Sequence, residues 1–495
     1  MENTGRIRRT LLPSARRILF DRDLESAIDN DLPYATEVDR AHLVMLSETG
    51  IVPRDRAARL LRAINRLRAD SFSPLRDRIA NRGLYLLYED WLIETEGAAT
   101  GGILQTARSR NDLNATVHKL KLRWPLTELL TAALRLEGVL LLHARQNLLT
   151  TMPAYTHGQA ALPITWGHYL AGLAQAVARD LDHLLFAARD LERCPLGAGA
   201  VGGATLPIDS QRTAALLGFT APCLNSVDAV ASRDLSLRIL AVLSILGVTL
   251  SRAACDLWRF VSAECGILQL PDELVGSSSA MPQKRNPFLL EHILGRTALL
   301  TGAFAAAAGA THGAPFTNSI AAGSEATRPL WQACQDATDV AKLLALIVSH
   351  AIPDHERMRN SAISGFTVAT EVANLLMCEG PMDFRSAHKL TGELVTHCVE
   401  RGHTIDSAEA MQFLAARGHT LELRGLTSDR VAASANWGGG PGALAVEHCL
   451  HQTCSQWAAQ VNAGRERMRR WKSAQRELER VVADCIVQGQ AVGKA

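Results

Sequence analysis

The sequence predicts a mainly α-helical protein with a central bundle of long helices. Three long segments carry apolar residues at three- and four-residue spacing, and they begin at Ala115, at Ile164 and at Leu235. Convincing alternating strand patterns are hard to find, and aromatic residues make up only 5% of the chain. Because thirty helical residues span about 45 Å, helices of this length are typical of a bundle.

Three changes in sequence texture predict three domains. Residues 1–112 mix short helices with charged turns, residues 113–361 hold the long helices, and residues 362–495 return to shorter segments with the glycine-rich stretch WGGGPGA. Pro125 lacks a backbone donor and crowds the preceding turn, so we expect it to kink or begin the first long helix. One chain would cover the wide apolar faces of the long helices poorly, which predicts a multi-subunit bundle.

Composition excludes several classes of partner. The 495 residues include 52 basic and 50 acidic ones, a net charge of +2, so no overall field attracts nucleic acid or an anionic membrane. Uncharged apolar runs such as 239–250 are far shorter than the ~18 residues of a membrane span, and we expect a soluble protein.

Two further features concern location. The ten cysteines are scattered without a CxxC pair, which is typical of the reducing cytoplasm. The arginine-rich start RIRRTLLPSARRILF has the composition of a transit peptide, but Pro13 interrupts its amphipathic pattern, so a solvated arm is favoured.

The stretch GSSSAMPQKRNP, residues 276–287, interrupts the helical pattern with the residue types that proton abstraction needs. A serine takes up a proton when its pKa is lowered, and Lys284 with Asn286 can hold an oxyanion. Removal of a proton next to a carboxylate creates an aci-carboxylate, whose extra negative charge is stabilised by fixed donors. The GxSxG nucleophile elbow of acyl transfer is absent from this stretch.

Two other polar stretches precede long helices. In TARSRND, Ser109, Asn111 and Asp112 can cap backbone N–H groups and leave donors for a carboxylate, although a plain capping loop is the alternative. In YTHGQAALP, Thr156 can hold a carboxylate oxygen, and His157 can move protons, since an imidazole in general titrates near neutrality. A lone loop histidine is more often structural, so this one depends on its neighbours.

Four other features favour structural explanations. PLGAGAVGGATLPID lacks a GxGxxG after a strand and a P-loop lysine, which disfavours nucleotide binding. In NSVDAVASRD, a structural salt bridge explains the charges of Asp228, Arg233 and Asp234 as well as a role in a site does. The spacing in EHCLHQTC matches no common zinc finger and favours helix packing, and the glutamates within RERMRRWKSAQRELER indicate a solvated helix that does not bind RNA.

The order and spacing of these motifs resemble the fumarase/argininosuccinate lyase superfamily. GSSSAMPQKRNP is similar to its GSSxMPxKxNP signature, TARSRND and YTHGQ match its other two site regions, and PLGAGAVGGATLPID with NSVDAVASRD resembles the argininosuccinate lyase branch. GFTVATEVANLL and FRSAHKL extend the resemblance over nearly the whole chain. It implies a three-domain homotetramer with a twenty-helix core, each active site shared by three subunits. The implied reaction is a reversible anti elimination of an N-substituted aspartate to fumarate and an amine, without metal or organic cofactor.

Residue by residue, the resemblance implies that Ser278 is the general base that removes the Cβ proton. A serine occupies the position where the family usually has glycine, which leaves Ser277 and Ser279 as alternatives. Lys284 and Asn286 would stabilise the aci-carboxylate, and His157 is the candidate acid or proton relay. The residues expected to bind substrate are Ser109, Arg110, Asn111, Thr156, Gln159, Met281 and Asn318.

The sequence departs from argininosuccinate lyases on the amine half of the site. Their Tyr-Asn-x-Asp-x-Gln tract reads FTNSIAAGSEATRP here, with Glu325 as the nearby carboxylate, their Glu-Asp-x-His element reads RGLY, and their Asp-Ile-x-Gly-Ser pattern reads DNDLPYATEVD. A guanidinium needs paired carboxylates and planar acceptors, and several are missing. We therefore expect a changed amine pocket, as in the ethylenediamine-N,N'-disuccinate lyases, which cleave an aminopolycarboxylic acid. An argininosuccinate lyase is the second expectation, and a non-catalytic relative resembling a lens protein is a remote third.

Overall fold

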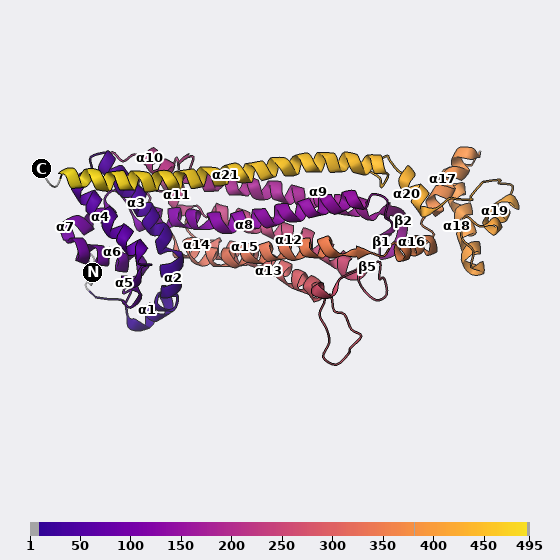
Figure 1. Cartoon of the computed structure of the whole chain (residues 1–495), viewed down its shortest axis with the longest axis horizontal. Coiled ribbons are helices and arrows are strands. Elements are labelled where there is room, and N and C mark those ends of the chain that lie inside the picture. The colour runs from indigo at the N-terminus through magenta and orange to yellow at the C-terminus, as the bar shows by residue number, and fades with distance from the viewer. Residues whose placement is uncertain (1–8, 381, 493–495) are drawn as a thin grey trace.

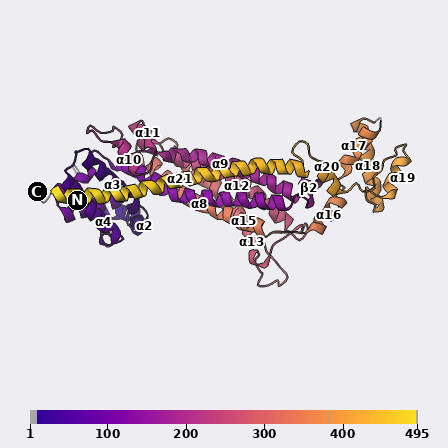
Figure 2. The same cartoon turned by 45° about the horizontal axis from the view of Figure 1, so that its top comes forward.

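The computed structural model describes residues 9–380 and 382–492 as an elongated, largely helical rod (Figure 1). Short helices form one end, long helices run through the middle, and a second group of short helices forms the other end. Figure 2 shows the same three-part arrangement from a second direction. The mainly α-helical fold that the sequence predicts is confirmed.

Short helices surround one apolar core at the N-terminal end. Ile28, Val38, Ile64 and Tyr88 are completely buried in it. The helices are α1 (Pro13–Leu19), α2 (Leu24–Asn30), α3 (Leu32–Glu48), α4 (Arg54–Ala69), α5 (Ser73–Arg76), α6 (Leu84–Glu96) and α7 (Ala98–Gly101), with the 3₁₀ turns η1 (Asp21–Asp23) and η2 (Gly102–Gln105).

Five long helices form the middle of the rod. Apolar residues at three- and four-residue spacing, such as Ala133, Leu136 and Leu140, are buried between them. The five helices are α8 (Arg110–Gln146), α9 (Trp166–Ala187), α12 (Asp234–Phe260), α13 (Phe288–Thr311) and α15 (Arg328–His350).

Pro125 lies inside α8, which continues from Arg110 to Gln146, so of the two expected outcomes, a kink or a helix start, the helix start is excluded. An interior proline costs a helix about 3 kcal/mol. Packing on both sides offsets this cost, because Leu122 and Leu126 are buried in the bundle core. Tertiary contacts therefore override the local preference.

Short elements connect the long helices. The hairpin of β1 (Thr151–Thr156) and β2 (Gln159–Thr165) joins α8 to α9. Pro153 and Pro163 face each other across this hairpin, and these prolines hid its strand pattern in the sequence. The other connecting elements are η3 (Ala188–Glu192), β3 (Arg193–Cys194), α10 (Ser210–Leu216), β4 (Ala221–Pro222), α11 (Ser226–Ala231), β5 (Leu268–Gln269), η4 (Asp272–Leu274), α14 (Ile320–Gly323), η5 (Glu325–Thr327) and β6 (Ile352–Pro353).

A small helical unit with its own core forms the far end of the rod. Val372, Leu394 and Leu414 are completely buried in that core. The helices are α16 (His355–Ser364), α17 (Ala369–Glu379), α18 (Phe384–Arg401), α19 (Ala408–Ala415) and α20 (Ser428–Ser434).

The last helix, α21 (Ala443–Val492), runs back along the bundle to the N-terminal end (Figure 1). Its 50 residues span about 75 Å. Leu478 and Val482 become part of the N-terminal core. The structure therefore differs from the predicted C-terminal domain of residues 362–495, because α21 packs on the other two parts of the chain.

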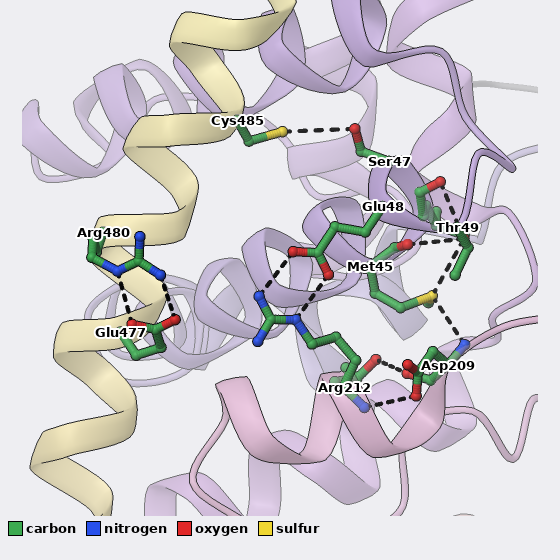
Figure 3. A network of polar contacts seen from close by, with 11 residues as sticks. Met45, Ser47, Glu48, Thr49, Asp209, Arg212, Glu477, Arg480 and Cys485 are labelled. Carbon is green, nitrogen blue, oxygen red and sulfur yellow. Dashed lines mark hydrogen bonds and ion pairs between the residues drawn. The ribbon is translucent and has the colours of Figure 1, made fainter.

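Figure 3 shows polar contacts around α3, α10 and α21. Cys485 of α21 lies 3.8 Å from the Ser47 hydroxyl of α3. Arg212 of α10 binds both carboxylate oxygens of Glu48 in α3, each at 2.8 Å, and its backbone N–H donates to Asp209 at 2.8 Å. These contacts hold α10 and the end of the glycine-rich stretch against α3.

The bundle leaves apolar surface uncovered on α12 and α13. Ile245 and Val248 of α12 and Leu299 of α13 are 54 to 62% exposed. By length and composition alone, both helices could cross a membrane, with mean hydropathies of 1.7 and 1.3 in their most apolar stretches, and so could the bent pair of α16 and α17 taken as one span. The short uncharged runs of the sequence do not indicate this property. An exposed apolar face is also what the predicted multi-subunit bundle requires, and the assembly stays a prediction.

Candidate active site

The predicted carboxylate-binding stretch TARSRND forms the start of α8 and the turn before it. Ser109 is the N-cap: its hydroxyl accepts from the Asn111 N–H at 3.3 Å, and Asp112 accepts from the Ser109 N–H at 3.0 Å, which completes a capping box. Asn111 does not cap as predicted, because its side-chain amide donates to the Ala200 carbonyl at 3.2 Å. Arg110 is exposed.

Asp112 also joins α8 to the glycine-rich stretch. Its second oxygen accepts from the N–H groups of Gly197 and Gly199, at 3.0 and 2.9 Å. Both glycines have positive φ, and a Cβ at Gly197 would lie 2.4 Å from the Ser210 hydroxyl. These glycines therefore let the backbone approach the Asp112 carboxylate closely.

A buried ion pair lies beneath the turn before α8. Arg108 and Asp39 of α3 are 2.5 Å apart, and both side chains are completely buried. Tyr85 of α6 contacts both partners: its hydroxyl donates to Asp39 at 3.2 Å and accepts from Arg108 at 2.5 Å. Burial raises the pKa of Asp39, and Arg108 opposes that shift.

His42 holds the same turn from α3. Its Nε2 lies 2.8 Å from the Thr106 carbonyl oxygen. Burial and the charge of Arg108 lower the pKa of His42 to about 3, so the ring is neutral near pH 7. Because a carbonyl only accepts, the proton of this neutral ring is on Nε2.

Thr156 and His157 lie on the β1–β2 hairpin. His157 and Gly158 form its two-residue turn, with φ of 53° and 77°, the left-handed pair that a type I′ turn requires. Arg259 of α12 fixes the hairpin, because its guanidinium lies over the Tyr155 ring and donates to the Gly158 carbonyl at 2.5 Å. The predicted site residues here, Thr156, His157 and Gln159, are exposed.

Residues 276–287 form a loop that projects from the bundle between α12 and α13 (Figure 1). Two backbone hydrogen bonds of 2.8 Å between Gly276 and Asn286 close its base. Inside the loop, the Ser278 hydroxyl oxygen accepts from the N–H groups of Met281 at 3.1 Å and Ala280 at 3.4 Å. The loop therefore holds Ser278 with its own backbone.

The cationic and amide groups of this loop are accessible. Lys284 and Met281 are exposed, and Asn286 is half-buried and donates to the Ser277 carbonyl at 3.4 Å. Within the part of the chain that the structure describes, the Lys284 ammonium has no hydrogen-bond or ion-pair partner. Its charge is free to meet an anion.

A single chain does not bring the three segments together. Arg110 begins α8 and the hairpin follows its end, so a helix of 37 residues separates them, about 55 Å. The 276–287 loop points away from the bundle in both views (Figures 1 and 2). A site that combines all three segments requires more than one copy of the chain.

A pocket of about 510 Å³ lies beside Arg110, between α2, α3, α8 and residues 320–331. Ile320 and Ser324, from the tract that departs from argininosuccinate lyases, line it. Asn318, expected to bind substrate, is exposed and lies two residues before this lining. Glu325 does not line the pocket, and it pairs with Arg328 at 3.2 Å.

The other charged motifs make local contacts within the described residues. Asp234 pairs with Arg238 along α12 at 3.3 Å, a partner outside the motif. Arg233, by contrast, is buried and donates to the carbonyls of Val230 and Ser232. EHCLHQTC is helical within α21, as predicted, and the described residues contain no cluster of potential metal ligands.

Several residues of the site region were missed in the sequence. Asp39, Tyr85 and Arg108 carried no local signal, because their contacts join segments far apart in the chain. The role of Asp112 had a signal, since Ser109 and Asp112 have the spacing of a capping box. Its bond to the glycine-rich stretch could not be inferred from that spacing.

Comparison with known proteins gives consistent matches. A family model described as "Lyase" matches residues 85–302, and one described as "Argininosuccinate lyase C-terminal" matches residues 366–429. The argininosuccinate lyase of Thermus thermophilus is 36% identical over 373 residues, which is 74% of this chain and 79% of that protein. The argininosuccinate lyase of Methanoculleus marisnigri is 35% identical over 398 residues, 80% of each chain.

Solved structures show the same fold. EDDS lyase in complex with formate has a TM-score of 0.85 at 25% identity and covers 98% of this chain and 97% of its own. A variant of EDDS lyase with bound fumarate has a TM-score of 0.86, also at 25% identity, over 99% of each chain. The class II fumarase of Schistosoma mansoni, at 15% identity, shares the fold with a TM-score of 0.65 over 78% of this chain and 87% of its own.

The fold and the matched motifs define a carbon–nitrogen lyase of the fumarase/argininosuccinate lyase superfamily. Within that superfamily, the chain belongs to the argininosuccinate lyase family.

Proposed function

We propose that this chain catalyses the reversible elimination of an N-substituted aspartate to fumarate and an amine. The observation that carries the proposal is the setting of Ser278, whose hydroxyl oxygen accepts from the backbone N–H groups of Ala280 and Met281. Fixed donors at an oxygen stabilise negative charge there. A serine held in this way is suited to take up the proton from the substrate Cβ.

The other predicted residues have complementary roles in this proposal. Lys284 and Asn286, on the same loop, stabilise the negative charge of the aci-carboxylate. His157, as acid or proton relay, supplies the proton that the leaving amine takes up when the C–N bond breaks. The residues proposed to bind or line the substrate are Ser109, Arg110, Asn111, Thr156, Gln159, Met281 and Asn318.

We propose that the sites form between subunits of a homotetramer. The separation of the three segments along α8 and the exposed apolar faces of α12 and α13 support this assembly. Four copies of the five long helices would give a twenty-helix core.

Subunit sharing is tested by mixing Ser278→Ala and His157→Asn proteins after denaturation and refolding them together. Random assembly leaves both residues intact in about a quarter of the sites when different chains supply them. Fumarate release should recover to about that fraction of the wild-type rate. No recovery in mixed tetramers of normal size would contradict sharing.

We propose an aminopolycarboxylic acid such as ethylenediamine-N,N'-disuccinate (EDDS) as the substrate. The EDDS lyase structures that match over nearly the whole chain, and the departures in the tract around Asn318, support this choice. Each hydrogen bond that a buried guanidinium loses should cost about 1 to 3 kcal/mol. Two or three such losses should reduce specificity for argininosuccinate about a thousandfold or more.

Argininosuccinate is the second candidate substrate, because the sequence relatives quoted above are argininosuccinate lyases. The experiment is a comparison of kcat/KM for fumarate release from EDDS and from argininosuccinate under identical conditions. A tenfold preference for argininosuccinate would establish this alternative. Fumarate release from either substrate would exclude the non-catalytic alternative.

The proposal places the enzyme in a reducing cytoplasm, and the structure leaves all ten cysteines free. It assigns no step to a metal or organic cofactor. Full activity after exhaustive dialysis against a chelator is the expected outcome.

A further inference from the structure

The pocket beside Arg110 has walls from both the N-terminal helices and the bundle. Arg110, His118 and Lys121 line it from one face of α8, at spacings of eight and three residues. Eleven residues of helix place the backbone of Lys121 about 16 Å further along the axis than that of Arg110. The pocket therefore extends away from the residue proposed to bind the succinyl half.

Cationic groups dominate the ionisable lining of this pocket. Among the described residues that line it, Arg82, Arg110 and Lys121 are cationic and Asp31 is the carboxylate. His118 adds no charge near pH 7, because burial and nearby cations lower its pKa to about 3. A substrate group in this pocket therefore meets an excess of positive charge.

Tyr85 also lines the pocket, but its hydroxyl is committed to Asp39 and Arg108. Asp31 is paired with Lys121 at 2.7 Å, so the one carboxylate is already neutralised. A guanidinium or ammonium entering here would find no free carboxylate among the described lining residues. A carboxylate would find donors.

Lys121 can exchange its partner Asp31 for a carboxylate of the substrate. Its ammonium lies 4.8 Å from the centre of the Trp331 ring, which holds the side chain over the pocket, and it is 27% exposed. A partly exposed ion pair such as Lys121–Asp31 contributes little to stability. Replacement of Asp31 by a substrate carboxylate therefore costs little and keeps the ammonium paired.

We infer that Lys121, assisted by Arg82, binds a second carboxylate on the amine half of the substrate. This inference rests on the proposed function, because it assigns the amine half of an N-substituted aspartate to this pocket. The substrate then carries negative charge at both ends, one at Arg110 and one at Lys121. Lys121 and Arg82 are specificity residues and take no part in the chemical step.

The test is a binding comparison in Ser278→Ala protein, in which the proposed base is absent. Titration calorimetry gives Kd for EDDS and for ethylenediamine-N-monosuccinate, which lacks the second succinyl group. We expect EDDS to bind about tenfold or more tightly, because a hydrogen bond to a charged partner is among the stronger contacts. When Lys121→Met is combined with Ser278→Ala, the Kd for EDDS should rise by about that factor, and the Kd for the monosuccinate should change about twofold or less.

Three companion variants sharpen the test. Lys121→Arg should keep the preference for EDDS, and Arg82→Met should reduce it. Asp31→Asn should tighten EDDS binding, since it removes the competing carboxylate. Lys472→Met, an exposed lysine on α21 outside the pocket, is the matched control and should change nothing.

The inference would be overturned if Lys121→Met weakened the binding of both ligands equally, or weakened the binding of neither. Fumarate release by the wild-type enzyme is measured separately. If the wild type releases no fumarate from either ligand while EDDS retains its Lys121-dependent preference, the proposed function fails and the second carboxylate site stands.

Discussion

The turn before α8 and the loop 276–287 carry different parts of the proposed chemistry, and they are held in different ways. Arg108 anchors the turn through a completely buried ion pair with Asp39. The loop is mostly exposed, and Arg285 binds Asp272 and the Leu270 carbonyl at its base. The turn proposed to bind a carboxylate is thus fixed by buried side chains, whereas the loop with the proposed base is held by its own backbone and by exposed contacts at its base.

The largest effect expected within this comparison is the loss of activity in Ser278→Ala. Without the base, kcat for fumarate release should fall about 10² to 10⁴-fold. The free energy of unfolding should change by less than about 0.5 kcal/mol, because Ser278 contributes little packing. Ser277→Ala and Ser279→Ala are the matched controls, and an equal loss in either would move the base to that residue.

Arg108→Met should act on stability. It leaves Asp39 buried without its partner, so the free energy of unfolding should fall by about 3 to 5 kcal/mol. Arg285→Met removes the exposed ion pair at the base of the loop and should cost about 0 to 1 kcal/mol. Denaturant unfolding of both variants measures the contrast, and equal costs would show that the two regions are held alike.

Lys284→Met should lower kcat about a hundredfold with little change in KM. The lost charge stabilises the developing aci-carboxylate more than the bound substrate. Steady-state kinetics beside Lys472→Met gives the measurement. A change confined to KM would assign Lys284 to ground-state binding.

The smallest expected effect is on the pH dependence of stability. His42 has a pKa of about 3 in the folded protein against 6.5 for a free imidazole, so only the unfolded chain binds its proton between these values. Stability from His42 is complete above pH 6.5 and is lost as pH falls below it. Between about pH 7 and pH 5.5 the loss should be about 1 kcal/mol.

His42→Gln should flatten this pH dependence without abolishing it, because His118 titrates in the same direction. The exposed His448→Gln is the control and should leave the slope unchanged. Denaturant midpoints measured across this pH range test the prediction. An unchanged slope in His42→Gln would show that the ring binds its proton as readily in the folded protein as in the unfolded chain.

Local patterns predicted much of the fold. The apolar spacing of the long helices follows from their packing in one core, and the capping pattern of Ser109 and Asp112 is local in sequence. The hairpin escaped prediction because Pro153 and Pro163 break the alternation of a strand pair. The helical character of EHCLHQTC was predictable, but periodicity does not say which surface a helix covers, so the return of α21 was not.

The candidate site was predictable only as separate segments. Ser278, His157 and Arg110 lie in motifs that can be recognised along the chain. Their partners cannot, since Arg108 and Asp39 are 69 residues apart and meet only after folding. The pocket at Lys121 likewise combines α8, the turn before α6 and residues 320–331.

The return of α21 bears on the order in which the chain can fold. Ile28, Val38 and Ile64 leave the ribosome long before Leu478 and Val482, which complete their core. Contacts between such distant positions form slowly, because a long loop must close first. The N-terminal helices therefore keep part of their apolar core uncovered until α21 has been synthesised, and a nascent chain presents that apolar surface to chaperones until then.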